Sequence, residues 1–564
     1  MKKKLTKIFS WLDNNILTVL TAILIVVIPL YPKLPLADLI TGYIVRLRLE
    51  DILIFIAGAV WIIQLIRRKI TLPKNTLAKL ILLYLVIGTL SSLSAVFITK
   101  TVPMERQHLA KLALHLFRRV EYFSLFFIAY TGFKTKRDLT LFVKVAIGTL
   151  LAAVLYGFGQ KYLYWPAFST MNREFSKGMR LYLTPTSRVM STFGGHYDYA
   201  AYLMMALTLL VAAFWSSKRY LQKIILFFLG LATYWSLILT ASRTSFIGYL
   251  AGITVIAYIM GRFRGKLKMF INWFITIILS LTIMLTMGDL SERFFQVLES
   301  PDILVHEITR VTPLQRDSLQ KFVTGAQEDL LVFKTALLSL KEKLNSPFGI
   351  RPKNSISTDE LAVAVSSDIP PVPEKPILPP DVTEEEDLIR KAMEASMSGA
   401  LTPSPSPVSG YSPNALRYGL SVAIRLDALW PRAIQGLQRN YLLGSGYSTL
   451  VKVEPNEFTY AESTDNDYLR MLGETGILGT ISYLAIILVL CYVSIRLIKQ
   501  SNQPISLTLG IGTIGVIVSL LVNATYIDVF ESSKIAYSLW ILAALVIKLL
   551  ELESKDVKPL KKSR

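Results

Sequence analysis

The chain has 564 residues, 52% of them hydrophobic, and a mean hydropathy of +0.46, which excludes an ordinary soluble protein. Lys and Arg outnumber Asp and Glu by 61 to 40, giving a formal net charge of +21. The basic residues form short clusters between apolar runs, so we expect them to face anionic membrane lipids rather than nucleic acid. The single cysteine, Cys491, excludes intramolecular disulfides and cysteine-based metal sites.

Apolar runs of membrane-spanning or nearly membrane-spanning length predict an all-α polytopic protein with about twelve transmembrane helices. The runs begin near Asn14, Asp51, Leu80, Val120, Leu139, Tyr197, Ile224, Phe246, Phe270, Ile477, Ile505 and Ile535. The first run follows a lysine cluster, as in a signal peptide, but it is long and ends at Pro29 without a small-residue cleavage site. We therefore expect it to be a retained helix.

The charged connections predict an orientation. Basic clusters at 67–79, 134–137, 218–223, 262–268 and 496–499, together with the basic C-terminal tail, all fall on one side if the helices alternate. By the positive-inside rule, that side and both termini are cytoplasmic. The connection 100–119 is the exception, because it carries five basic residues among leucines on the expected outer side. Either the helix count is wrong there, or an amphipathic helix on the outer surface holds an anionic partner.

Three parts follow from this arrangement. Residues 1–287 hold the first nine helices and an outer loop at 159–196, and residues 288–474 form a large extracytoplasmic loop domain with helical patterning. A Pro/Ser/Glu-rich stretch within that domain, 352–413, is too poor in apolar residues to bury a core and is predicted to be disordered. Residues 475–564 hold the last three helices and the basic tail.

The stretch Ser463–Gly479 closes the loop domain and runs into an apolar helix. Asp465 and Asn466 are suited to cap that helix, but a carboxylate at a membrane-facing cavity is equally suited to act as general base for a sugar hydroxyl. Glu474 comes nine residues after Asp465. That separation is about two and a half helical turns, so the two carboxylates project to opposite sides of an unbroken helix and need not act together.

Several arginines are candidates for a polar site, and three of them recur at a spacing suited to gripping a diphosphate. Arg243 lies in a hairpin next to Ser242, and a charge so close to hydrocarbon either snorkels to the surface or points into a polar cavity, which the neighbouring hydroxyls favour. Arg425, Arg432 and Arg439 recur every seven residues and share a face if the helix is continuous. Pro431 interrupts that helix, and an ordinary solvated face is the competing interpretation, preferred for Arg439.

The segment Ser191–Tyr199 enters the membrane after the first outer loop. Its two glycines permit close approach of a ligand to the backbone, and His196 and Asp198 are candidates for binding sugar hydroxyls. A turn followed by a helix cap explains the same residues. The sequence predicts no metal site and no cofactor, because the four histidines are scattered and no phosphate-binding glycine motif is present.

Taken in order, these motifs resemble the O-antigen ligase and O-antigen polymerase superfamily of bacterial membrane glycosyltransferases. The resemblance covers most of the chain. It rests on the Ser-Thr-Phe-Gly-Gly-His entry at Ser191, the Ser242-Arg243 hairpin, Arg425 with Trp430, and the Gly444-Ser445-Gly446 turn. The most specific part is Asp465-Asn466-Asp467-Tyr468-Leu469 leading to Glu474-Thr475-Gly476-Ile477-Leu478-Gly479.

The resemblance implies transfer of a glycan from undecaprenyl diphosphate to a glycan, lipid or protein acceptor on the outer face of the plasma membrane. It implies that Arg243 and Arg425 stabilise the leaving diphosphate and that no metal is required. Ligases of this type commonly have His-Asn where this chain has Asp465-Asn466, and the histidine is assigned to acceptor activation. This difference argues against a lipopolysaccharide ligase specifically and leaves Asp465 to act as the base. The insertion at 352–413 is a second departure.

Two other classes of protein fit the same totals. About twelve helices with both ends inside also describe a transporter or flippase for lipid-linked glycans, although transporters place ionisable residues near the bilayer centre rather than at outer helix ends. A membrane scaffold whose outer loop recruits partners is the third interpretation. The sequence does not identify the acceptor, the donor sugar or the oligomeric state.

Overall fold

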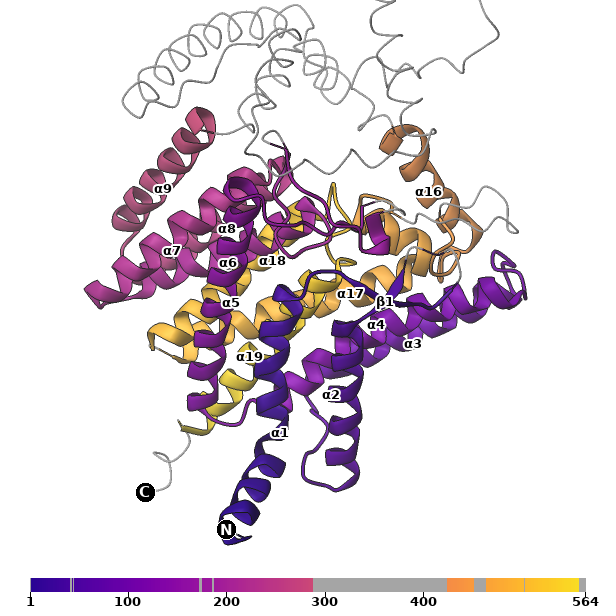
Figure 1. The fold of residues 1–564 in the computed structure, drawn as a ribbon, viewed down its shortest axis with the longest axis horizontal. Helices are drawn as coiled ribbons and strands as arrows, with labels where there is room; N and C mark the ends of the chain where they lie inside the picture. The colour runs from indigo at the N-terminus through magenta and orange to yellow at the C-terminus, as the bar shows by residue number, and fades with distance from the viewer. Residues whose placement is uncertain are drawn as a thin grey trace, which may run out of the picture.

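The computed structural model describes residues 2–40, 43, 45–171, 175–184, 187–287, 424–450, 463–501 and 503–556. The predicted disordered segment 352–413 and most of the loop domain 288–474 lie outside these residues. Within them, 11 helices are long and apolar enough to cross a membrane, so the protein is a helical, multi-pass membrane protein. Figure 1 shows these helices as one bundle.

Each of the predicted apolar runs lies in a helix. The helices before the loop domain are α1 (Lys2–Leu30), α2 (Leu49–Ile66), α3 (Thr76–Phe97), α4 (Arg106–Gly132), α5 (Lys136–Tyr162), α6 (His196–Ser216), α7 (Tyr220–Leu239), α8 (Arg243–Arg264) and α9 (Lys266–Met287). Within the last part of the loop domain lies α16 (Trp430–Arg439), and α17 (Asp467–Gln500) begins there; α18 (Pro504–Asn523) and α19 (Ser533–Asp556) follow. One prediction of twelve differs: the run at Val120 is the second half of α4, which is not among the 11 spans.

The polar first half of α4 explains why the connection 100–119 carries basic residues on the side where the positive-inside rule does not expect them. Lys111 and Arg119 lie on this helix, and both are almost fully buried. Buried charges require partners, and α4 packs along α19, which brings acidic residues of the C-terminal part within reach. Lys111 and Arg119 therefore point into the protein instead of lying on a membrane surface, whereas Arg106 at the start of α4 is exposed.

The two ends of the described chain lie at the same end of the bundle. Lys534, at the start of α19, donates hydrogen bonds to the carbonyl oxygens of Pro29 and Tyr31 at the end of α1. The two helices are therefore antiparallel, and the first turns of α1 and the last turns of α19 extend in one direction, toward the bottom of Figure 1. The connections after α1, α5, α7 and α18 gather at the opposite end, where Thr192 contacts Pro29 and Asn523 contacts Ser245.

A short antiparallel hairpin, which the sequence analysis did not predict, follows α1. It consists of β1 (Pro35–Asp38) and β2 (Arg46–Arg48), and an ion pair of 3.0 Å joins Arg46 to Asp38. The hairpin is too short to carry the alternating pattern by which strands are recognised. The hairpin matters because it sets the positions of two basic residues: Lys33 comes just before it, and Arg48 is its last residue.

The helix α17 is broken near its start, at Gly476, where φ is 66°. A Cβ atom on this residue would lie 2.4 Å from the carbonyl oxygen of Leu442, so only glycine fits. The backbone groups freed by the break pair with the preceding loop: Ser445 N bonds to Gly473 O at 2.8 Å, and Ile477 N bonds to Tyr441 O at 2.9 Å. The Gly444–Gly446 turn is thereby fixed against the broken helix.

Candidate functional site

The connection between α18 and α19, residues 524–532, organises the polar end of the bundle. Its Asp528 accepts hydrogen bonds from the backbone N–H groups of Thr464 and Asn466, at 2.9 and 2.8 Å. Asp467 N donates to Ala524 O at 3.0 Å, and the Asn466 side chain also caps α17 by accepting from Leu469 N. The α18–α19 connection therefore fixes the backbone on both sides of Asp465.

Asp465 itself is held in an unusual backbone conformation, with φ of 51°, which Asp tolerates better than most residues. Its carboxylate lies 2.8 Å from the guanidinium of Arg425 and accepts a hydrogen bond of 2.5 Å from Ser463 Oγ. The Asp465 side chain remains 31% exposed, whereas that of Arg425 is 7% exposed. The guanidinium carbon of Arg425 also lies 4.0 Å from the ring centroid of Tyr526, so a cation–π contact orients it. Two predicted catalytic residues are thus in direct contact.

The surroundings of Asp465 affect its proton affinity. Partial burial raises the pKa of this carboxyl, and the negative charge of Asp528 adds to the increase. The Ser463 hydrogen bond and the positive charge of Arg425 act against it. The net effect is a pKa above the ordinary value for aspartate, which brings the carboxylate closer to the range in which a general base is effective.

Glu474 lies in a separate cluster at the break in α17. Its two carboxylate oxygens lie 3.3 Å from Arg119 and 3.5 Å from Arg470, and the first of these arginines also pairs with Glu531 at 2.7 Å. Ser448 N donates to the same carboxylate at 3.0 Å, and only 4% of the Glu474 side chain is exposed. Asp465 and Glu474 therefore pair with different arginines.

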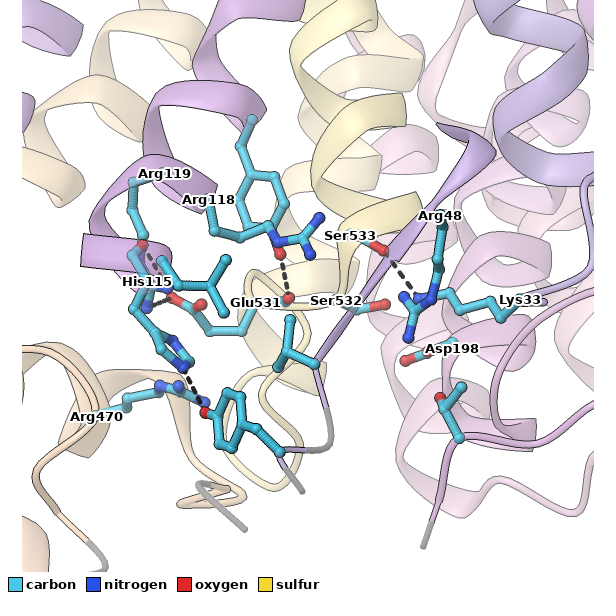
Figure 2. Close-up of a pocket in the computed structure, with 15 residues that line it drawn as sticks. Lys33, Arg48, His115, Arg118, Arg119, Asp198, Arg470, Glu531, Ser532 and Ser533 are labelled. Atoms are coloured by element: carbon cyan, nitrogen blue, oxygen red, sulfur yellow. Dashed lines mark hydrogen bonds and ion pairs between the residues drawn. The ribbon is translucent and has the colours of Figure 1, made fainter. Parts of the chain in front are cut away.

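A cavity of about 270 Å³ lies beside these clusters and is shown in Figure 2. Its charged lining comes from six elements or connections: Lys33, Arg48, Arg118, Arg119, Asp198, Arg470 and Glu531. His115 also lines it and bonds to the hydroxyl of Tyr43 at 2.8 Å. Burial raises the pKa of Glu531. Cations outnumber carboxylates on the cavity wall.

The remaining predicted residues are spread around this end of the bundle. Arg243 is exposed at the start of α8, where the adjoining Ser245 accepts a hydrogen bond from Asn523 at the end of α18. His196 is buried, and its Nε2 lies 2.7 Å from the guanidinium of Arg188. Asp198 faces the cavity.

The seven-residue arginine stripe does not form one face. A π-helical turn, Arg425–Leu429, precedes α16, and Pro431 falls in the first turn of that helix. The wider turn shifts the register, so that Arg425 is buried, Arg432 is half-buried and Arg439 is exposed. Pro431 lies at the start of a helix, where the N–H that proline lacks would have no partner within the helix, so it does not destabilise α16.

Sequence reasoning missed most of the cavity. Asp528 and Glu531 lie in a nine-residue connection with no motif, and Arg470 lies in the stretch Ser463–Gly479 without having been assigned a role. The signal available was the cost of placing charges next to hydrocarbon: Arg118, Arg119 and Glu531 all require partners at this depth. Arg119 pairs with Glu531, more than 400 residues further along the chain, and no local sequence pattern reports such a contact.

The described residues contain no group of three or more His, Cys, Asp or Glu side chains placed to hold a metal ion. Asp465 and Asp467, the pair with ligand-like spacing, point apart, because Asp467 is buried and accepts a hydrogen bond of 3.0 Å from Phe530 N. Asp467 thus stabilises the α18–α19 connection.

No protein-family model matches the chain, and no curated protein sequence matches it significantly. The class that the fold defines is a multi-pass helical membrane protein with paired arginines and carboxylates, and a cationic cavity, at the end of the bundle opposite its termini.

Proposed function

We propose that the protein is a metal-independent inverting glycosyltransferase. It moves a glycan from undecaprenyl diphosphate to an acceptor hydroxyl on the outer face of the bacterial plasma membrane, in cell-surface polysaccharide biosynthesis. The observation that supports this most is the contact of 2.8 Å between a partly exposed carboxylate, Asp465, and a buried guanidinium, Arg425. A base and a cation in contact at a helix end are the two groups that this reaction needs.

In the proposed transfer reaction, Asp465 and Arg425 each have one role. The acceptor oxygen attacks the anomeric carbon of the donor sugar while the bond from that carbon to the diphosphate oxygen breaks. The bonding electrons leave with the diphosphate, and the acceptor proton moves to Asp465. Arg425 stabilises the charge that develops on the leaving group. Attack from the face opposite the diphosphate inverts the configuration.

The resting ion pair fits this sequence of events. A bound diphosphate carries more charge than one carboxylate and competes for the guanidinium of Arg425, which releases Asp465 to accept a proton. The Tyr526 ring keeps the guanidinium in place during the exchange, since it binds the face and leaves the N–H groups available. Arg243 and Arg432 lie on neighbouring elements and add positive charge for the donor.

The orientation follows from charge and geometry together. The basic clusters of the described connections lie on the side of the two ends of the described chain, and the positive-inside rule assigns that side to the cytoplasm. With α1 antiparallel to α19, this assignment supports an outer position for Asp465, where lipid-linked glycans are consumed. The acceptor is a glycan, lipid or protein with a free hydroxyl.

The experiment is transfer in reconstituted membranes with purified protein, lipid-linked glycan from the same host and candidate acceptors. Wild type should consume the donor, and Asp465→Ala and Arg425→Ala should each slow the reaction by about 10²–10³-fold. Arg439→Gln, which removes an exposed arginine from α16, should leave the rate unchanged. Full activity in the Asp465→Ala, Arg425→Ala double variant would refute the proposal.

A transporter or flippase for the same lipid-linked glycans is the second candidate, and the break in α17 favours it. Transporters build substrate sites at interrupted membrane helices, and Gly476 interrupts one here. The break falls near the start of the helix, however, and not at its middle. The reconstituted system separates the two functions: a transporter moves intact donor across the bilayer and forms no glycosylated acceptor.

A further inference from the structure

The two halves of the cavity differ in how their cations are neutralised. On one side, Arg118 pairs with Asp51 at 2.7 Å and with Glu121 at 3.0 Å. Arg119 and Arg470 are held by Glu474, Glu531 and Asp528. In this half the carboxylates are at least as numerous as the guanidinium groups.

The other half is formed by Lys33 and Arg48, which flank the β hairpin (Figure 2). Lys33 is 6% exposed, and its Nζ donates to the hydroxyl of Ser533 at 2.8 Å. Among the described residues, no carboxylate forms an ion pair with it. Arg48 has one, Glu50, at a distance of 3.8 Å. Two neighbouring buried cations therefore share little negative charge, which is costly unless an anion joins them.

The same half presents further hydrogen-bond donors. Ser533 begins α19, a helix of 24 residues, so the positive end of its dipole faces the cavity. Ser532 also lines the cavity, and its Oγ is buried without a hydrogen-bond partner. Across the cavity, Arg119 Nε is likewise buried and without a partner. Unsatisfied donors in a cavity wall indicate a missing acceptor.

We propose that Lys33, Arg48, Ser532 and the first turn of α19 form a binding site for a phosphate-type anion, either a phosphate ester or a diphosphate. The site is separate from the Asp465–Arg425 pair and contains none of the residues to which transfer chemistry is assigned. It stands on the cavity alone and does not require that the protein transfers glycans. Asp198, on the same cavity wall, is placed to accept hydrogen bonds from hydroxyl groups attached to the bound phosphate.

The test measures the midpoint of thermal unfolding of the purified full chain in zwitterionic nanodiscs, as inorganic pyrophosphate is added at constant ionic strength. Wild type should show a saturable rise. Lys33→Met keeps the length of the side chain but removes its charge. It should weaken pyrophosphate binding and so raise the half-saturation concentration by about tenfold or more. Lys74→Met, the same change at an exposed lysine, should respond like wild type.

A second variant keeps the test decisive if Lys33→Met does not fold. Ser532→Asp places a permanent anion beside the two cations, so it should raise the unfolding midpoint without pyrophosphate and abolish the response to it. A wild type with no saturable rise, or equal responses in wild type and Ser532→Asp, would overturn the proposal. An anion response without any transfer in the reconstituted assay would leave this site standing and reject the glycosyltransferase.

The source of the phosphate is distinguished with lipids. Nanodiscs containing a polyprenyl diphosphate or phosphatidic acid are compared with phosphatidylcholine alone, each with and without pyrophosphate. A midpoint already raised by the polyprenyl diphosphate or by phosphatidic acid, with no further rise on adding pyrophosphate, assigns the site to a lipid head group. A response to pyrophosphate that is the same in all three membranes assigns it to a soluble phosphate compound.

Discussion

Asp465 and Glu474 flank the first turns of α17 and are held in different ways. Glu474 contacts two arginines and a backbone N–H, and its side chain is 4% exposed. Asp465 contacts one arginine and one hydroxyl, and its side chain is 31% exposed. The Glu474 carboxylate is enclosed by its protein partners, whereas the Asp465 carboxylate keeps one side exposed to solvent. A carboxylate that reacts needs that free face, and one that holds a broken helix does not.

The comparison also separates two uses of arginine at the same end of the bundle. Arg119 links α4 to both α17 and the α18–α19 connection, and removing it would take an ion-pair partner from two carboxylates, Glu474 and Glu531. Arg425 contacts the Tyr526 ring and pairs with Asp465, whose side chain is 31% exposed, so a ligand with greater charge can compete for the guanidinium from the solvent side. Burial of the arginines does not distinguish them, since both are almost fully buried; the exposure of their carboxylate partners does.

The largest effect on stability is expected for Glu474→Ala. It leaves Arg119 and Arg470 facing each other in a buried site, and breaking a buried pair in this way costs about 3–5 kcal/mol of unfolding free energy. Thermal unfolding in nanodiscs measures the loss. Glu105→Ala is the matched control, because that side chain is 69% exposed and should change stability little. A Glu474→Ala protein as stable as this control would reject the structural role.

A smaller loss is expected for Gly476→Ala, which tests whether the break in α17 is required. The positive φ is unfavourable for alanine, and the new methyl group would meet the Leu442 carbonyl at 2.4 Å. The expected cost is about 1–3 kcal/mol, with the Gly444–Gly446 turn displaced. Gly230→Ala, in α7, has open space around the added methyl and should be neutral or slightly stabilising. Equal unfolding midpoints for the two variants would show that the break carries no strain.

The smallest of these effects concerns pH. The raised pKa of Asp465 means that lowering the pH protonates the base, so the transfer rate should fall on the acid side at a pH above the ordinary aspartate value of about 3.9. Ser463→Ala removes a hydrogen bond that stabilises the ionised carboxylate. It should therefore move the acid limb to higher pH, by about one unit or less. An acid limb that stays in place in Ser463→Ala would show that another group is titrating.

Much of the fold could be predicted because a helix that crosses the hydrocarbon core of a membrane must be long and apolar, and such runs are visible in the sequence. All the predicted apolar runs lie in helices, and the class of the protein is confirmed. The predicted number of transmembrane helices differed at α4, because charged residues in this helix form ion pairs inside the protein. A hydropathy pattern cannot anticipate that, because the partners of Arg119 lie more than 350 residues away, in α17 and the α18–α19 connection.

The candidate site was predicted less completely. Arg425 and Asp465 were chosen for their chemical type, and the structure brings them into contact. Lys33 and Arg48 were not selected, because neither belongs to a sequence motif. Only the folded chain shows that a short hairpin turns both of them into a cavity. Roles that depend on the number of partners, as for Glu474, are likewise invisible before the chain is folded.

The most direct test of the central claim measures unfolding and transfer together for Asp465→Asn and Glu474→Gln, in the same reconstituted membranes. The account predicts that Asp465→Asn unfolds within about 1 kcal/mol of wild type but loses transfer, because the Asp465 side chain is 31% exposed and solvent screens its ion pair with Arg425. Glu474→Gln should lose stability. If Asp465→Asn transfers glycan at the wild-type rate, Asp465 is not the base and the assignment of this site is wrong.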